Sequence, residues 1–171
     1  HSDRPREIEI TSYAEIVLGP ATDDLAHPAF GKLFIETEYL PERTALLCAR
    51  RPRSAGEEAL WAVHVLSLEG RTQGPLEWET DRSRFLGRGN TAARPAAMAT
   101  AVLSDSEGSV LDPIVAIRRT VSVDPDEAVA VQIVTGACET RDQALAFIGL
   151  YRDHHFVERA FAMASARSQA V

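Results

Sequence analysis

The stretch Leu60-Trp61-Ala62-Val63-His64-Val65-Leu66-Ser67-Leu68 decides the fold class of this chain. Its apolar side chains fall on both parities, and a strand of this kind buries both of its faces. We therefore expect a central strand of a sheet that is covered on both sides. In this setting Trp61 is interpreted as a core residue, and His64 as a core or interface histidine whose ring nitrogens have hydrogen-bond partners.

Segments on both sides of this stretch alternate between apolar and polar residues, which is typical of strands with one buried face. The predicted strands are Ile8 to Leu18, Leu33 to Tyr39, Thr44 to Arg50, Leu76 to Thr80, Ile114 to Val123 and Val129 to Thr135. Asp124-Pro125-Asp126 is a turn signal, so the last two strands are expected to form a hairpin. Gly70 and Gly74-Pro75 are expected to bracket a further turn.

Helical patterns are confined to a short stretch from Asp23 to Phe30 and to the end of the chain. Thr140 and Gln143 form a capping-box pattern, and Asp153 can cap a second helix. The apolar stripe of that second helix comprises Phe156, Val157, Ala160, Phe161 and Ala164. The stripe either leads toward a following domain or folds back on the sheet. Strands first and helices last predict a mainly β fold, an antiparallel β-sandwich.

Composition narrows the function classes. The chain has 171 residues, which fits one domain, and its net charge of −7 disfavours nucleic acid as a partner. It contains no apolar run of bilayer length and no signal-peptide pattern. The opening His1-Ser2-Asp3, without Met, fits a processed chain or a piece of a longer protein. Cys48 and Cys138 are expected to be buried reduced thiols, and nothing predicts a metal or a cofactor.

The long irregular region from Asp81 to about Ser109 contains the first candidate site. The planar guanidinium group of arginine can donate several hydrogen bonds to sugar hydroxyls, phosphate or carboxylate, and glycines allow the backbone to approach a ligand closely. The candidate residues for substrate binding or a domain interface are Trp78, Asp81, Arg82, Arg84, Phe85 and Arg88. The alternative is an Arg/Asp network that pins the loop and contacts a neighbouring domain. Trp78 is placed either in the core or in this site.

Other polar residues favour structural roles. Glu36 with Glu38, and Glu77 with Glu79, are predicted to mark wet sheet surfaces, and Asp112-Pro113 a turn that enters a core strand. His154 and His155 are expected to be solvated. No residue is assigned a catalytic role.

An ordered set of motifs resembles the sandwich domain of glycoside hydrolase family 94. The motifs are Ile10 to Leu18, His27-Pro28-Ala29-Phe30, Leu33 to Glu38, Glu79 to Gly89, Leu111-Asp112-Pro113-Ile114 and Tyr151-Arg152-Asp153. Within the family the resemblance is closest to the C-terminal phosphorylase-like region of cyclic β-1,2-glucan synthases. It implies a super-sandwich similar to galactose mutarotase, followed by a linker and an (α/α)6 barrel that holds the general acid and the phosphate site. The expected boundaries are 1–138 for the sandwich and 139–171 for the start of the linker.

The resemblance thus implies a non-catalytic carbohydrate-binding or structural domain of a β-glucan phosphorylase or cyclic glucan synthase. Its expected partners are a β-glucan, the following barrel and a second copy in a homodimer. The expected location is the cytoplasm or the cytoplasmic side of the inner membrane. A free-standing carbohydrate-binding module, a mutarotase-like enzyme and a purely structural spacer remain as alternatives.

Overall fold

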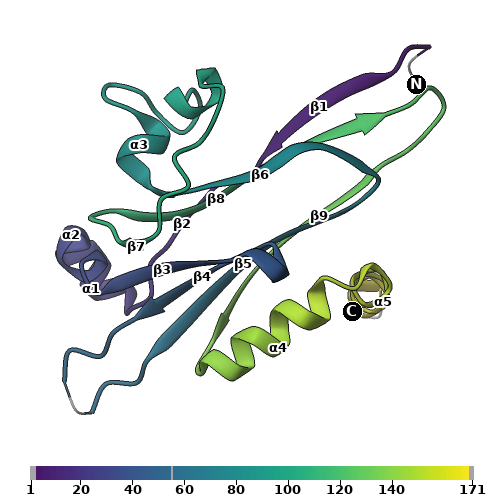
Figure 1. The fold of residues 1–171 in the computed structure, drawn as a ribbon. Coiled ribbons are helices and arrows are strands. Elements are labelled where there is room, and N and C mark those ends of the chain that lie inside the picture. The colour runs from purple at the N-terminus through teal and green to yellow at the C-terminus, as the bar shows by residue number, and fades with distance from the viewer. Residues whose placement is uncertain (1–2, 55, 170–171) are drawn as a thin grey trace.

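Two antiparallel sheets face each other in the computed structural model, which describes residues 3–54 and 56–169 (Figure 1). In the first sheet, β8 (Pro113–Val123) pairs with β1 (Arg6–Thr11) and β2 (Ala14–Glu15) along one edge and with β6 (Arg71–Asp81) along the other. The second sheet has the order β7 (Gly108–Ser109), β3 (Ile35–Leu40), β4 (Ala45–Arg50), β5 (Leu60–Glu69) and β9 (Ala130–Cys138). The predicted mainly β sandwich is therefore confirmed.

Strand β5 is buried on both faces, as its sequence predicts. Ala62 and Leu66 pack between the two sheets, while Val63 and Val65 pack on the outer face of the second sheet. The outer face is covered by α4 (Arg141–Tyr151), whose Ala144 and Ile148 are fully buried. One strand thus contributes to two apolar clusters.

The predicted hairpin of β8 and β9 is wrong. Strand β8 is already paired along both edges in the first sheet, whereas β9 pairs with β5 in the second, from Trp61↔Cys138 to Glu69↔Ala130. The turn at 124–126 therefore carries the chain from one sheet to the other. A local turn signal specifies a reversal of direction, and it does not specify which sheet each arm joins.

Two other strand predictions need correction. Gly74-Pro75 lies inside β6, at a register shift between Gln73 and Glu77, and is not a turn between strands. The predicted strand Ile8 to Leu18 divides into β1 and β2 around Ser12, which stays bound to β8: its N–H donates to the Ile117 carbonyl at 2.9 Å, and its Oγ accepts from the Ile117 N–H at 3.0 Å. Glycine and proline are typical of such irregular strand positions.

The short helices follow the expected pattern. Helices α1 (Ala21–Ala26) and α2 (Pro28–Lys32) occupy the predicted stretch, and a 3-10 turn, η1 (Pro41–Arg43), joins β3 to β4.

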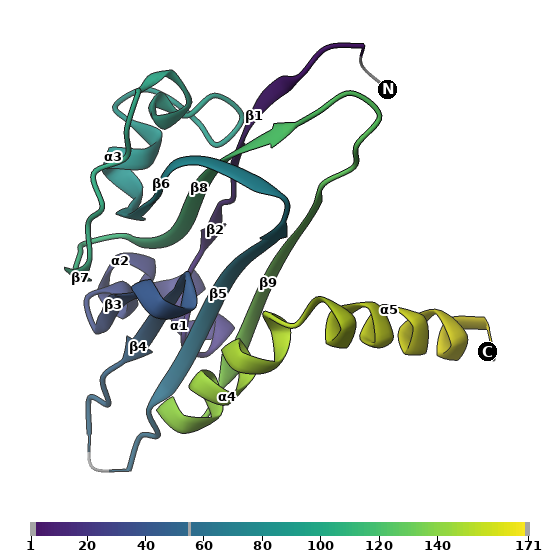
Figure 2. The ribbon, with the colours of Figure 1, turned by 45° about the vertical axis from the view of Figure 1, so that its right-hand side comes forward.

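Thr140 Oγ1 accepts from the Gln143 N–H at 3.2 Å, and Asp153 caps α5 (His154–Gln169) through the His155 N–H at 3.0 Å. Figure 2 shows α5 running away from both sheets.

The irregular region after β6 is a packed layer and not an open loop. It contains α3 (Arg82–Leu86), the 3-10 turn η2 (Ala96–Ala99) and β7. It covers the outer face of the first sheet (Figure 1) with an apolar cluster formed by Phe85, Leu86, Ala97, Leu103, Ile114 and Ala116. Both sheets are therefore covered over part of their outer faces, one by α4 and the other by this region.

Candidate functional site

The predicted segment Asp81–Arg88 forms α3 and its two ends. Asp81 is the N-cap, and its Oδ1 accepts from the backbone N–H of Ser83 at 2.8 Å and from the Ser83 hydroxyl at 2.7 Å. Arg84 donates to Ser104 Oγ at 3.1 Å, with its Nε 3.7 Å from Asp81. Arg88 is exposed just past the helix, after Gly87, which adopts a positive φ of 75°. Asp81 and Arg84 are thus held within the domain itself.

Arg82 belongs to a surface network that joins four parts of the chain, here called the Arg82 cluster: Tyr13, Glu15, Lys32, Arg82 and Asp112. Arg82 Nε and the Tyr13 hydroxyl donate to Glu15 Oε1 at 3.0 and 2.9 Å. Lys32 Nζ lies 2.6 Å from one oxygen of Asp112, and Arg82 Nη1 lies 3.5 Å from the other. Positive and negative groups therefore alternate across the Arg82 cluster. Several of the sequence motifs that resemble glycoside hydrolase family 94 contribute residues to it.

Electrostatics and stacking fix the conformation of this cluster. The hydrogen bond from Tyr13 is the main cause that lowers the pKa of Glu15, with Arg82 adding to it, and burial raises the pKa of Tyr13. The Tyr13 ring stacks on Phe85 with centroids 4.9 Å apart. Phe85 is 3% exposed, so it supports the cluster from below and is not available to a ligand.

Two buried charged residues, Glu79 and Arg118, hold the loop that follows α3. Glu79 accepts from the hydroxyls of Ser104, at 2.6 Å, and Ser106, and from the backbone N–H groups of Thr80 and Asp81 at 3.1 and 3.0 Å. Its exposure is only 2%, so the predicted wet surface is wrong for this residue. A buried charge is stable only when it is paired or hydrogen-bonded, and the serines of the loop fill that need.

Arg118 was missed by the sequence reasoning, although an arginine inside an apolar strand is a signal of a buried partner. It is 2% exposed and lies on β8 between β1 and β6. Its guanidinium donates to the carbonyls of Thr100 at 3.0 Å and Ala97 at 2.5 Å, and lies 3.3 Å from Glu9 and 3.8 Å from Glu77. Arg118 therefore ties η2 to the outer face of the first sheet.

Trp78 lies apart from the other candidate residues. Its ring faces the space between the sheets, where it stacks on Tyr39 with centroids 3.7 Å apart and packs against the central core. Its Nε1 is buried with no hydrogen-bond partner among the described residues. The structure thus brings together Asp81, Arg82, Arg84 and Phe85, and it separates Trp78 from them.

Histidines and thiols have mostly structural surroundings. His64 is 1% exposed, and its ring nitrogens lie 2.7 Å from Thr135 Oγ1 and 2.8 Å from Ser12 Oγ, which confirms the prediction of a core histidine with partners. His154 is half-buried, bonded to Gln132 and 3.1 Å from Glu158, so the prediction of a solvated residue is wrong for it. Cys48 is buried, as expected, but Cys138 is only half-buried, and both are free thiols.

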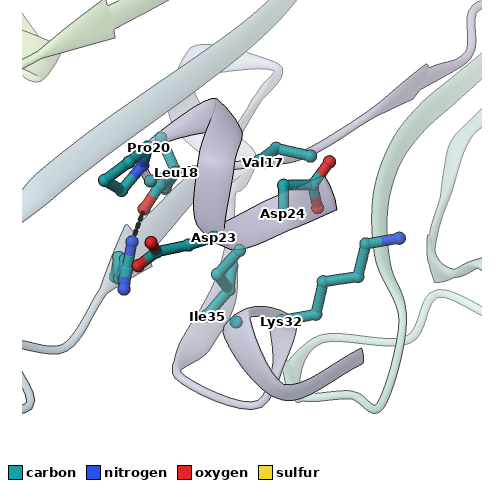
Figure 3. Close-up of a pocket in the computed structure, with 10 residues that line it drawn as sticks. Val17, Leu18, Pro20, Asp23, Asp24, Lys32 and Ile35 are labelled. Carbon is teal, nitrogen blue, oxygen red and sulfur yellow. Dashed lines mark hydrogen bonds between the residues drawn. The ribbon is translucent and has the colours of Figure 1, made fainter. Parts of the chain in front are cut away.

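The pocket in Figure 3 is too small for a sugar. It lies between the segment that follows β2, α1, α2 and the β3–β4 pair, and its volume of about 20 Å³ suits a single water. Figure 3 shows the carbonyl of Leu18 accepting a hydrogen bond, which comes from Arg50. A Cβ at Gly19 would clash with the same guanidinium. The absence of a side chain at Gly19 therefore allows the Arg50 guanidinium to lie close to the backbone. The pocket is formed around this arginine, which has a structural role.

Within residues 3–54 and 56–169, no group of three or more His, Cys, Asp or Glu side chains is arranged to hold a metal ion. Among the helices in the same ranges, none is both long and apolar enough to cross a bilayer.

The fold is a two-sheet antiparallel sandwich domain, and the hydrogen-bonded and ion-paired Arg82 cluster lies on its surface. The chain belongs to the family described as the glycosyl hydrolase 94 supersandwich domain, whose model matches residues 1–154. A similar protein is the cyclic beta-(1,2)-glucan synthase NdvB of Rhizobium meliloti (strain 1021), with 37% identity over 165 residues. The match covers 96% of this chain and 6% of that relative, so the chain spans a small part of it.

Proposed function

We propose that this chain is the non-catalytic sandwich domain of a cyclic β-1,2-glucan synthase or β-glucan phosphorylase, and that it serves as a platform for a following helical barrel. The observation that carries the proposal is the anchoring of the region after β6. Glu79 and Arg118 fix its backbone from below, while the Arg82 cluster presents alternating charges above. A surface of this kind binds a polar partner with little loss of side-chain entropy, since its groups are already in place.

In this proposal, Arg82, Arg84 and Arg88 contact the barrel or its substrate, and Asp81 and Phe85 position them. Trp78 supports the same region from inside the sandwich. The uncovered apolar side of α5, with Phe161 73% exposed and Met163 59% exposed, supports a role of this helix as the start of the linker. Two free thiols are consistent with a cytoplasmic setting.

A mutarotase-like activity is the weaker alternative. That chemistry needs an acid and a base that reach substrate in one cleft. His64 is buried with both ring nitrogens occupied, and burial lowers its pKa to about 4. It is therefore unsuited to proton transfer with a sugar.

The test compares the isolated chain with the protein that contains it. The isolated chain should show no phosphorolysis or hydrolysis of β-1,2-glucan and no change in mutarotation rate. In the containing protein, Arg82→Glu should lower the melting temperature of the barrel by several degrees and reduce turnover, because it places a like charge beside Glu15. Arg71→Glu, at the opposite end of β6, is the matched control, since it also places a like charge beside an exposed acid, Asp124, but lies outside the Arg82 cluster. Turnover by the isolated chain would refute the proposal.

A further inference from the structure

The outer face of the second sheet is only partly covered, and the uncovered part contains Trp61. Strand register places Ser109, Glu36, Ala49, Trp61 and Cys138 in one row across all five strands. The next row contains Glu38, Leu47, Val63 and Gly136, where α4 begins to cover the sheet through Phe147. Trp61 thus lies at the border between the cluster under α4 and open surface.

A hollow of about 390 Å³ opens at this border, here called the Trp61 hollow and lined by Glu36, Glu38, Leu47, Ala49, Trp61 and Ser109. Ligand pockets in proteins run from roughly 300 to 1,000 Å³, so the size suits a small ligand or part of a chain. Ala49 lies between Glu36 and Trp61 in the row, and its small side chain leaves the hollow open between them.

Trp61 offers the hollow an apolar surface. The residue is half-buried against the cluster under α4, and the rest of it lines the hollow. Within the described ranges, its Nε1 makes no hydrogen bond, and the buried unpartnered atoms include the Nε1 of Trp78 and not that of Trp61. The Trp61 N–H is therefore accessible, in contrast to that of the other tryptophan.

Ion pairs and hydrogen bonds already hold the polar side chains around the hollow before a ligand binds. Arg141, the first residue of α4, donates to both oxygens of Glu38 at 2.7 and 2.9 Å. Glu36 Oε1 lies 3.3 Å from Arg51 Nη1 and 3.4 Å from Ser109 Oγ, and no described residue occupies Oε2. The four charged side chains remain 43–57% exposed, so their other donor and acceptor positions face water.

We propose that the Trp61 hollow binds a segment of neutral β-glucan. A pyranose ring has an apolar face of C–H groups and an edge of hydroxyls, so it matches an aromatic surface beside fixed carboxylate and guanidinium groups. The Glu/Arg pairs balance one another in charge, which suits a neutral ligand better than an anion. This inference rests on the proposed function for the identity of the sugar.

Nuclear magnetic resonance tests the site directly, because the chain has two tryptophans and hence two indole N–H signals. Trp61→Phe and Trp78→Phe assign the signals in the full chain. Titration with linear β-1,2-linked gluco-oligosaccharides should shift the Trp61 signal in a saturable way and leave the buried Trp78 signal unmoved. Titration calorimetry should give a dissociation constant that Trp61→Ala weakens by about tenfold or more.

Two further variants keep the test independent of any folding defect in Trp61→Ala. Ala49→Leu fills the hollow while it keeps the tryptophan, and it should weaken binding at least as strongly. Glu36→Gln should weaken binding severalfold, whereas Glu127→Gln, at an exposed carboxylate in the turn between the sheets, should not. Circular dichroism confirms that each variant is folded.

The outcomes separate this inference from the proposed function. An unmoved Trp61 signal together with no calorimetric heat overturns the site and leaves the platform role intact. Heat with an unmoved Trp61 signal means that glucan binds elsewhere, which also overturns the site. A Trp61 signal that responds only to protein concentration identifies a contact between copies of the chain and has the same consequence.

Discussion

At the scale of single residues, buried charge is the main determinant of the surface near α3. Glu79 uses its carboxylate to bind two hydroxyls and two backbone N–H groups, so one buried side chain makes several of the contacts that hold the loop from Ser104 to Ser106. Removing a partner from a buried polar group costs about 1–3 kcal/mol because the remaining groups stay desolvated.

Glu79→Gln should therefore destabilise the domain by about 1–3 kcal/mol, since an amide NH2 would face donors. Urea unfolding measures the loss, and hydrogen exchange should show faster exchange at 103–107. Glu7→Gln, at an exposed position of β1, serves as the control and should stay within about 0.5 kcal/mol of the original. Equal effects of the two changes would contradict the anchoring role of Glu79.

His64 gives the domain a pH dependence with a defined sign. Burial lowers its pKa to about 4 from an ordinary value of 6.5, so the unfolded chain binds the proton more readily than the folded one. The stability contributed by neutral His64 is present above pH 6.5 and is lost as the pH falls toward 4, by an amount on the order of 3 kcal/mol.

The free energy of unfolding should thus fall between pH 7 and pH 5 in the original chain. His64→Gln should reduce this slope, although it lowers stability at pH 7, because glutamine does not titrate. His27→Gln, at an exposed histidine, serves as the control substitution. An unaltered slope in His64→Gln, measured by urea unfolding at several pH values, would show that other groups cause the dependence.

At the scale of elements, the packing of α4 on β9 depends on the absence of a side chain at Gly136. A Cβ there would lie 2.5 Å from the Phe147 ring, which cannot move away without losing its place under the helix. Overpacking of this kind costs typically 1–3 kcal/mol.

Two glycine-to-alanine changes test this packing. Gly136 lies on β9 under the buried side of α4, and Gly149 lies on the exposed side of the helix. Gly136→Ala should destabilise the domain by about 1–3 kcal/mol, because Phe147 and α4 must shift. Gly149→Ala, on the exposed side of α4 with nothing within 4 Å, should stabilise it by roughly 0.5–1 kcal/mol through helix propensity. Thermal unfolding of both variants checks the prediction, and a neutral Gly136→Ala would mean that the helix is loosely packed.

At the scale of the whole molecule, the sandwich and α5 differ in how much they bury. Val157 is 4% exposed, whereas Phe161, one turn further along α5, is 73% exposed. The helix is therefore anchored to the rest of the chain at its start, and the remainder of its apolar side is uncovered. This asymmetry supports the proposed linker role.

Val157→Ala should accordingly cost about 1–2 kcal/mol through lost burial. Phe161→Gln should change the free energy of unfolding by less than about 0.5 kcal/mol while it lowers self-association of the isolated chain. Denaturant unfolding and light scattering measure the two effects. A large destabilisation by Phe161→Gln would indicate that α5 folds back on the sheets in solution.

The sequence by itself determined the number and type of most elements, since alternation, capping residues and Gly/Pro signals act over a few residues. It predicted the burial of both faces of β5, the capping of α4 and the resemblance that the family match confirms. Only the tertiary structure decided that β8 and β9 belong to different sheets, that Glu79 is buried and that Trp61 borders a hollow. Each of these depends on which segment covers a given face, and coverage is set by contacts between residues far apart in the chain, which no local pattern encodes.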